Sequence, residues 1–290
     1  MRTLSKKQPR RIFLYIRPIC PFTSSRAGCG NSESKDAELR PDMNIREYWA
    51  DLHIHTLLSP CAELEMLPSL IVEVAQTAGL DIIGIADHNS CENAAAVIEA
   101  AKGSSVKVFP GIEVNSLEGI HLLCLFDTVD QAMKLQDRVY EKLIRLDAAS
   151  RYYKQQMVVD SSDEFIRYLE EPIALPTTMD INEAYDLVNE LNGIIIPSHI
   201  DRHEMGLCGV LGMVPEVPDF IGVEISRNLT EEEARNRYPS IGNRAIFRDS
   251  DAHWLGAIGE RRTALHLAHR TVEEIKLACR RVDGRRVGDA

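Results

Sequence analysis

Several features that define specialised classes of protein are missing from this chain of 290 residues. No apolar run approaches the roughly 20 residues needed to cross a bilayer. The nearest candidate, 12–22, is interrupted by Arg17, Pro18 and Pro21. The seven cysteines are dispersed, odd in number and without a CxxC pair, which favours neither a disulfide framework nor a structural zinc site. These absences predict a soluble, cytoplasmic protein without a membrane partner.

An excess of positive charge and a glycine-rich phosphate loop are also missing. Lys and Arg number 33 against 44 Asp and Glu, which gives a formal net charge of −11. This balance argues against the binding of long nucleic acids through a broad basic surface. No GxGxxG or GxxxxGK[ST] motif follows an apolar run, so a nucleotide-binding fold loses its main support.

The composition that is present, 44% hydrophobic and 27% charged residues, is that of an ordinary globular protein. The first 42 residues differ, because they carry nine basic residues and only four acidic ones. We expect 1–42 to be disordered or to be a wrongly assigned leader, since Met43 directly precedes the first strand-like run. Residues 43–290 are then expected to form a single domain.

Seven short apolar runs alternate with helical patterns after Met43, and most are rich in Ile and Val on both faces, as in buried parallel strands. The runs are 48–53, 80–86, 106–114, 120–126, 193–199, 220–226 and 244–249. Capping pairs Asp180/Glu183 and Thr271/Glu274 open two of the helices. The alternation predicts an α/β fold, a βα barrel of about seven strands. A long connection, about 127–180, is inserted; it includes a polar helix over 130–156 and a strand or hairpin over 157–173.

Six of the nine histidines lie at or beside the edge of a strand-like run. In a parallel barrel the carboxyl ends of the strands converge on one face, where active sites are built. Five of the six map to that face, and His121 is the exception because it opens its run. The six are His53, His55, His88, His121, His199 and His253.

Acidic residues accompany these histidines. Glu113 closes the third run, Asp87 precedes His88, and Asp251 lies two residues before His253. Ionisable groups crowded at one pocket would be costly without a cation. Imidazole together with carboxylate suits Zn, Mn or Fe, and the pattern therefore predicts a site for divalent metal ions.

The motifs resemble, in order and spacing, those of the PHP (polymerase and histidinol phosphatase) domain family, over about residues 44–259. They are Asp51-Leu-His-Ile-His-Thr56, Gly84-Ile-Ala-Asp-His-Asn89, Pro110-Gly-Ile-Glu113, His199 and Asp251-Ala-His253. The resemblance implies a distorted, TIM-barrel-like seven-stranded βα barrel. It also implies two or three divalent ions (Mn, Zn or Fe) that hydrolyse phosphate esters, as in the stand-alone phosphoesterase branch. The implied ligands are His53, His55, His88, Glu113, His121, His199, Asp251 and His253.

One position departs from the family pattern. Relatives place an Asp or His a few residues after the HxH motif, where this chain has Ser59-Pro60-Cys61. Cys61 is either a softer metal ligand or an unligated thiol. The implied ions would lower the pKa of a bridging water and offset charge in the transition state. Asp87 and Asp251 are candidates for the general acid, and Arg202 is a candidate clamp for the substrate phosphate.

The expected activity is hydrolysis of a phosphate monoester or diester of a small metabolite or short nucleotide. One alternative is a regulatory or interaction module with a degenerate metal site, which Cys61 favours. The other is an amidohydrolase-like hydrolase of C–N bonds, because metal-loaded barrels also carry out that chemistry. The sequence leaves the substrate, the general acid and the oligomeric state open.

Overall fold

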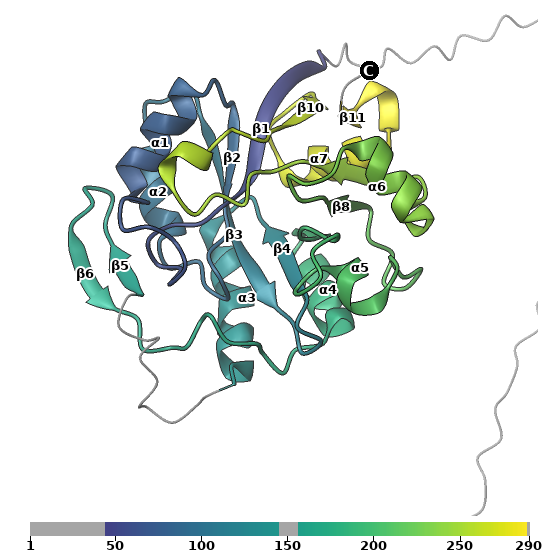
Figure 1. Ribbon diagram of the computed structural model, residues 1–290. Helices are drawn as coiled ribbons and strands as arrows, with labels where there is room; N and C mark the ends of the chain where they lie inside the picture. The colour runs from purple at the N-terminus through teal and green to yellow at the C-terminus, as the bar shows by residue number, and fades with distance from the viewer. Residues whose placement is uncertain (1–43, 145–155, 289–290) are drawn as a thin grey trace, which may run out of the picture. The chain divides into compact units, whose positions relative to one another are not determined.

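The computed structural model describes residues 44–144 and 156–288 (Figure 1). The leader expected over 1–42 lies outside the described residues. Among the described residues, the structure contains no helix with the length and apolar character that a membrane span requires.

The centre of the fold is a curled sheet of seven strands that forms a half-barrel (Figure 1). Its strands, from edge to edge, are β11 (Arg286–Val287), β10 (Thr263–Leu267), β1 (Arg46–Ile54), β2 (Ile82–Ile85), β3 (Lys107–Asn115), β4 (His121–Leu125) and β7 (Ile194–Pro197). The pairs β1–β2 and β2–β3 are parallel, whereas β3–β4, β4–β7, β1–β10 and β10–β11 are antiparallel. The predicted barrel-like α/β fold is confirmed, but its sheet is mixed.

All seven predicted runs form strands, with a different distribution between sheets. The last two runs, β8 (Gly222–Glu224) and β9 (Ala245–Phe247), pair in parallel as a separate two-stranded sheet. Two further strands, β10 and β11, complete the central sheet instead. The sequence pattern identified strands by their apolar character, which does not specify partners.

Seven α-helices lie among the described residues: α1 (Pro68–Thr77), α2 (Ala94–Ala100), α3 (Val129–Lys142), α4 (Ile181–Glu190), α5 (Leu207–Leu211), α6 (Glu231–Arg237) and α7 (Val272–Cys279). The predicted caps are present. The Asp180 carboxylate accepts a hydrogen bond from the Glu183 amide at 2.9 Å, and the Thr271 hydroxyl accepts one from Glu274 at 3.3 Å. Each cap satisfies an amide that the first helical turn leaves without a partner.

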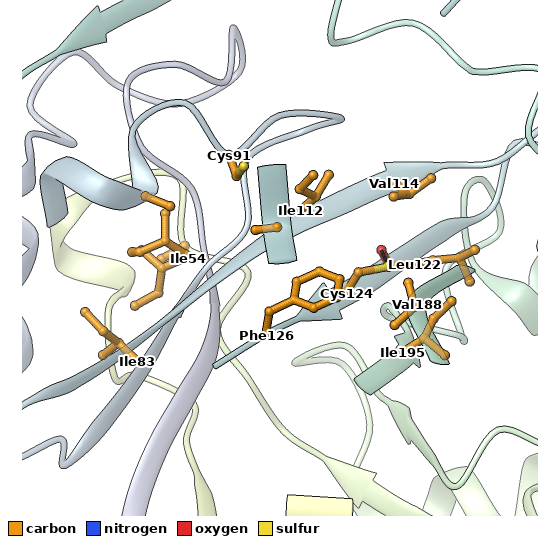
Figure 2. Packing of buried hydrophobic residues seen from close by; sticks show 14 of the residues in the cluster. Ile54, Ile83, Cys91, Ile112, Val114, Leu122, Cys124, Phe126, Val188 and Ile195 are labelled. Atoms are coloured by element: carbon orange, nitrogen blue, oxygen red, sulfur yellow. Dashed lines mark hydrogen bonds between the residues drawn. The ribbon is translucent and has the colours of Figure 1, made fainter. Parts of the chain in front are cut away.

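The sheet buries a hydrophobic layer on each of its faces because side chains alternate along each strand. One layer joins the strands to helices α1–α4; Figure 2 shows Leu122 of β4 and Ile195 of β7 beside Val188 of α4. The second layer joins the opposite face to β9 and α7. Packing on both faces holds the strand ends, and hence the side chains that follow them, in fixed positions.

The inserted connection contains α3 and a hairpin of β5 (Met157–Val159) and β6 (Phe165–Tyr168), as predicted for 157–173. Helix α3 ends at Lys142, and 145–155 of the predicted helix lies outside the described residues. The Asn89 side chain donates hydrogen bonds to the carbonyls of Ile173 and Leu175, both at 2.8 Å. These bonds fix the insertion beside the loop that follows β2.

Candidate metal centre

The end of β1 supplies the first two histidines of the site. His53 and His55 are fully buried, and their Nε2 atoms lie 3.2 Å apart. Residues two apart on an extended chain point the same way, which is why both rings face one centre. The backbone of 252 pairs with the same strand end, because His55 donates to the Ala252 carbonyl and Ala252 donates to that of His53. This pairing brings the Asp251 segment against the two histidines.

Glu113, at the carboxyl end of β3, lies at the middle of the site and is 1% exposed. Its two carboxylate oxygens lie within 3.5 Å of nitrogen atoms from five histidines. For Oε1 the distances are 3.3 Å to His53 Nε2, 3.0 Å to His121 Nδ1 and 3.2 Å to His199 Nε2; for Oε2 they are 2.9 Å to His88 Nδ1 and 3.5 Å to His55 Nε2. One carboxylate is therefore shared among side chains from four other segments.

His121 joins this group because β4 runs antiparallel to β3. The register pairs Asn115 with His121, so the first residue of β4 lies beside the end of β3. The sequence pattern had made His121 the exception, since a histidine that opens a parallel strand would lie at the opposite edge. The reversed direction of β4 removes that conflict.

Backbone pairing also places His88 and His199. His88 forms an isolated parallel bridge with Glu113, and the amide of Ser198 donates to the His121 carbonyl at 3.0 Å. His199 has φ +30° and Asp251 has φ +52°, and residues other than glycine seldom adopt this backbone region. Strained residues of this kind cluster at functional sites, where the surrounding structure maintains them.

Asp251 and His253 close the site from the loop after β9. Asp251 Oδ1 lies 3.2 Å from His55 Nε2, and Oδ2 lies 2.5 Å from the guanidinium of Arg202. The Nδ1 atom of His253 lies 2.9 Å from the carbonyl oxygen of Asp251, which leaves Nε2 of that ring for a ligand. Arg202, the predicted phosphate clamp, is thus anchored at the rim of the site.

Cys61 lies beside two of these histidines. Its Sγ is 3.1 Å from His88 Nε2, and it also forms a hydrogen bond with His253. Burial alone raises the pKa of the thiol, but the hydrogen bonds with His253 and His88 outweigh this effect and lower the pKa to about 6. Cys61 therefore occupies a position among the nitrogen donors, and its thiolate form is favoured there.

Asp87 is placed differently from its predicted role. It is fully buried, its Oδ1 accepts hydrogen bonds from the Thr56 amide and the Ser59 hydroxyl, and its Oδ2 accepts one from the Thr56 hydroxyl, all at 2.7 Å. It does not line the cavity of the site. The structure thus places Asp87 behind the site, where it supports its neighbours, and the role of Asp87 as a general acid stays a prediction. Asp87 holds Ser59, whose Oγ lies 2.9 Å from His55 Nδ1.

Glu224 is a residue of the site that the sequence analysis missed. It ends β8, is 1% exposed, and its Oε2 lies 2.8 Å from His53 Nδ1 while its Oε1 accepts the His199 amide at 3.0 Å. A carboxylate on the outer nitrogen of a histidine fixes the tautomer and directs the other nitrogen toward a metal. Its position at a strand end was the available signal.

The charges of the site depend on one another. Burial lowers the pKa of His53, but the carboxylates of Glu224, Glu113 and Asp251 raise it to well above the usual value. Burial raises the pKa of Glu113, yet His121 and His53 hold it well below its usual range. These shifts favour an ionised Glu113 beside a protonated His53, whereas burial lowers the pKa of His55 well below its usual value.

The donor atoms fit divalent ions. Glu113 Oε2 and His121 Nδ1 are buried and approach polar neighbours closely, but neither makes a well-directed hydrogen bond in the described part of the chain. His53, His55 and His253 each have Nδ1 tied to an oxygen atom, which leaves Nε2 available. Donor sets that aim at a shared point and have their outer nitrogens fixed are characteristic of metal ligands.

The site forms the floor of a cavity of about 510 Å³, which His88, Glu113, His121, His199 and Asp251 line together with Cys61 and Arg202. Pro60, Ala174 and Met205 contribute apolar wall. Ala174 comes from the inserted connection, so that segment shapes the cavity. All eight residues predicted as ligands therefore lie together at the floor of this cavity, around Glu113.

A family model for the PHP domain matches residues 51–205, which is more than half of the chain. The chain belongs to the PHP domain family. PHP domains occur in metal-dependent phosphoesterases, which are hydrolases. The matched region contains Glu113 and the site histidines that lie in or just after β1, β2, β4 and β7. His253, Asp251 and Glu224 lie beyond it.

Solved structures share the fold of this PHP protein. The lesion-specific endonuclease Q of Pyrococcus furiosus has a TM-score of 0.60 at 18% identity, over 83% of this chain and 58% of that one. The complex of endonuclease Q with a 27-mer duplex that carries an abasic lesion gives the same values. An amidohydrolase from Chromobacterium violaceum with bound sulfate has a TM-score of 0.51 at 18% identity, over 73% and 90% of the two chains.

The PHP chain therefore spans less than two thirds of the length of endonuclease Q. No curated protein sequence matches it.

Proposed function

We propose that the protein hydrolyses a phosphate monoester or diester of a small metabolite or short nucleotide, with two or three divalent ions bound at the floor of the cavity. The observation that carries this proposal is the convergence of five histidines on the single carboxylate of Glu113. Such a group has no structural purpose that a hydrophobic cluster would not serve better, because burying charges without an ion is costly.

Three overlapping groups of donors support binding of more than one ion. Within each group the donor atoms lie within 4.8 Å of one another: His53, His55 and Glu113; His88, Glu113 and His121; His55, His88 and His253. Asp251 adjoins the first group and His199 the second. Bound ions of this kind lower the pKa of water and neutralise phosphate oxygens.

Arg202 and Asp251 act together in this proposal. Burial raises the pKa of Asp251, but His53 and the hydrogen bond with His55 hold it well below its usual range. An ionised Asp251 has no proton to give to a leaving group, so we assign it to ion binding and to orienting Arg202. The Arg202 side chain is 43% exposed at the rim, and its guanidinium is placed to bind a phosphate oxygen.

The cavity favours a substrate of limited size. Its apolar wall, Pro60, Ala174 and Met205, suits the carbon skeleton of a small metabolite or one nucleoside. Endonuclease Q in complex with duplex DNA shares the fold, but this chain matches only 58% of it and carries a net charge of −11. A short nucleotide satisfies both observations.

Metal analysis and turnover test the proposal together. We expect purified protein loaded with Mn²⁺, Zn²⁺ or Fe²⁺ to retain two or three equivalents and to hydrolyse p-nitrophenyl phosphate or its bis ester. His53→Ala is expected to lose both metal and turnover. His269→Ala, an exposed histidine away from the site, is the matched control. Protein that retains no ion and turns over neither ester contradicts the proposal and favours the interaction module.

Inhibition separates the two hydrolase chemistries. A phosphoesterase of this kind is expected to be inhibited competitively by inorganic phosphate, the product that its ions and Arg202 bind. Turnover of a C–N substrate without inhibition by phosphate would instead support the amidohydrolase-like alternative.

A further inference from the structure

A second cavity lies against the metal centre, on the side of the loop that follows β9. It has a volume of about 140 Å³ and shares four residues with the main cavity: His199, Arg202, Asp251 and His253. The candidate ligands therefore lie between the two cavities. When a phosphate group binds to them, its two ester substituents can extend into different cavities.

The two cavities differ in chemistry. The second one is lined by Arg227, Trp254, Ser226 and the buried carboxylates of Glu224 and Asp249. The guanidinium carbon of Arg227 lies 5.6 Å from the centre of the Trp254 ring, within the range of a cation–π contact. Among the described residues, no tryptophan, tyrosine or phenylalanine lines the main cavity.

Trp254 is unusual for its position. It follows His253 directly in the chain and is 37% exposed, although tryptophan is mostly buried in folded proteins. The chain has only two tryptophans. An exposed indole beside a metal centre offers a flat apolar surface with a polar edge, which suits a planar ring.

The surroundings of this indole are fixed in place. The Ser226 hydroxyl and amide both donate to the carboxylate of Asp201, at 2.6 and 2.7 Å, which holds the loop that carries Arg227. In the described part of the chain, Asp249 Oδ2 is buried without a hydrogen-bond partner, and Asp249 lines this cavity at 3% exposure. A buried carboxyl oxygen without a partner is suited to a hydrogen bond with a polar group of a ligand.

From this arrangement we infer that the second cavity is a nucleoside subsite, in which Trp254 stacks on the base of a nucleotide whose phosphate lies at the metal centre. The inference rests on the proposed phosphoesterase function and names its substrate class as a nucleotide phosphodiester. Arg227 supports the indole, and the carboxyl group of Asp249 forms a hydrogen bond with the base. The remaining ester group of the diester then occupies the main cavity.

Two chromogenic diesters with the same leaving group test the subsite. Thymidine 5′-(p-nitrophenyl) phosphate carries a nucleoside, and methyl p-nitrophenyl phosphate carries a methyl group in its place. We expect kcat/KM of the unmodified protein to favour the nucleoside ester by about tenfold or more, because stacking of one base on an aromatic ring has an effect of this size. Trp254→Ala is expected to reduce that ratio to about threefold or less, mainly through KM. Trp254→Phe should retain most of it.

Tyr168→Ala is the matched control, since Tyr168 is an exposed aromatic residue of β6. It is expected to keep the ratio of the unmodified protein. An unchanged ratio in Trp254→Ala overturns the subsite while leaving the phosphoesterase function in place. Turnover of neither diester nor of p-nitrophenyl phosphate contradicts the proposed function.

A fluorescence titration decides the subsite in that last case. In a Trp49→Phe background Trp254 is the single tryptophan, and we titrate the zinc-loaded protein with thymidine 5′-monophosphate or methyl phosphate. Saturable quenching by the nucleotide alone supports the subsite. Equal effects of the two ligands, or no effect of either, overturn it.

Discussion

Replacement of Glu224 by Gln is the most direct test of how the metal centre is held. The two oxygens of Glu224 satisfy two buried donors, His53 Nδ1 at 2.8 Å and the His199 amide at 3.0 Å. A glutamine of the same shape has one acceptor oxygen, and its NH₂ group faces a second donor. One buried N–H group therefore loses its partner.

The structure sets the expected size of this effect. An unsatisfied buried donor costs about 1–3 kcal/mol. The free energy of unfolding of Glu224→Gln, measured without metal, should therefore be lower than that of the unmodified protein by about 1–3 kcal/mol. Loss of a carboxylate behind a metal-binding histidine typically weakens metal affinity by about 10- to 100-fold. We expect both changes, since the same side chain orients His53 and supports His199.

Chelator competition gives the metal affinity, and urea unfolding in the presence of excess chelator gives the stability. Glu231→Gln is the control, because Glu231 is an exposed residue of α6 whose ion pair, among the described residues, is with the side chain of Arg235. That variant should change stability by less than about 0.5 kcal/mol. If Glu224→Gln binds the ions within threefold of the unmodified protein, Glu224 does not position the ligands as described.

Three further predictions concern the thiol, the pH dependence and the sheet. Cys61→Ser should lower the affinity for Zn²⁺ more than the affinity for Mn²⁺, because a thiolate is a softer ligand. It should also remove the near-ultraviolet sulfur-to-metal absorption band of the Co²⁺-loaded protein, whereas Cys279→Ser in α7 should keep that band. A band that survives Cys61→Ser contradicts a Cys61 ligand. Metal affinity should rise as the pH increases above 6.5, because the pKa of His53 is well above that value and its proton must leave when a metal ion binds. Calorimetry in two buffers of different ionisation enthalpy would detect the released protons. Metal binding without proton release would contradict this explanation. Gly84→Ala should lower the midpoint of urea unfolding strongly, because a Cβ atom at this position would overlap the Leu52 carbonyl. Gly256→Ala should change that midpoint little, because a Cβ atom there makes only ordinary contacts. Equal midpoints for the two variants would refute the packing argument.

The sequence indicated which candidate ligands lie together better than it indicated the arrangement of the strands. His53, His55 and Glu113 stand out because ionisable residues that end an apolar run need an explanation wherever the run is placed. The direction of β4 was not predictable, since a short apolar strand looks the same in either direction. That direction decides whether His121 reaches Glu113, so its role became clear only from the pairing of β3 with β4.

Asp87 and Glu224 show what side-chain direction adds to sequence position. Asp87 and Glu224 are both carboxylates near strand ends, and the sequence shows which residues lie there but not which way their side chains turn. Asp87 turns toward Thr56 and Ser59, whereas Glu224 turns toward His53. Sequence position therefore identified the neighbourhood of the site, and side-chain direction, which depends on tertiary packing, separated ligands from their supports.

The antiparallel pairing of β3 with β4 has a consequence for how the protein assembles. Glu113 and His121 are eight residues apart and meet through a local hairpin, whereas His253 reaches them from the far end of the chain. An ion that bridges these groups closes a very long chain loop, much as a cross-link would. Amide hydrogen exchange in the segment after β9 should therefore respond most strongly when the ions are withdrawn, while the β3–β4 hairpin keeps its protection.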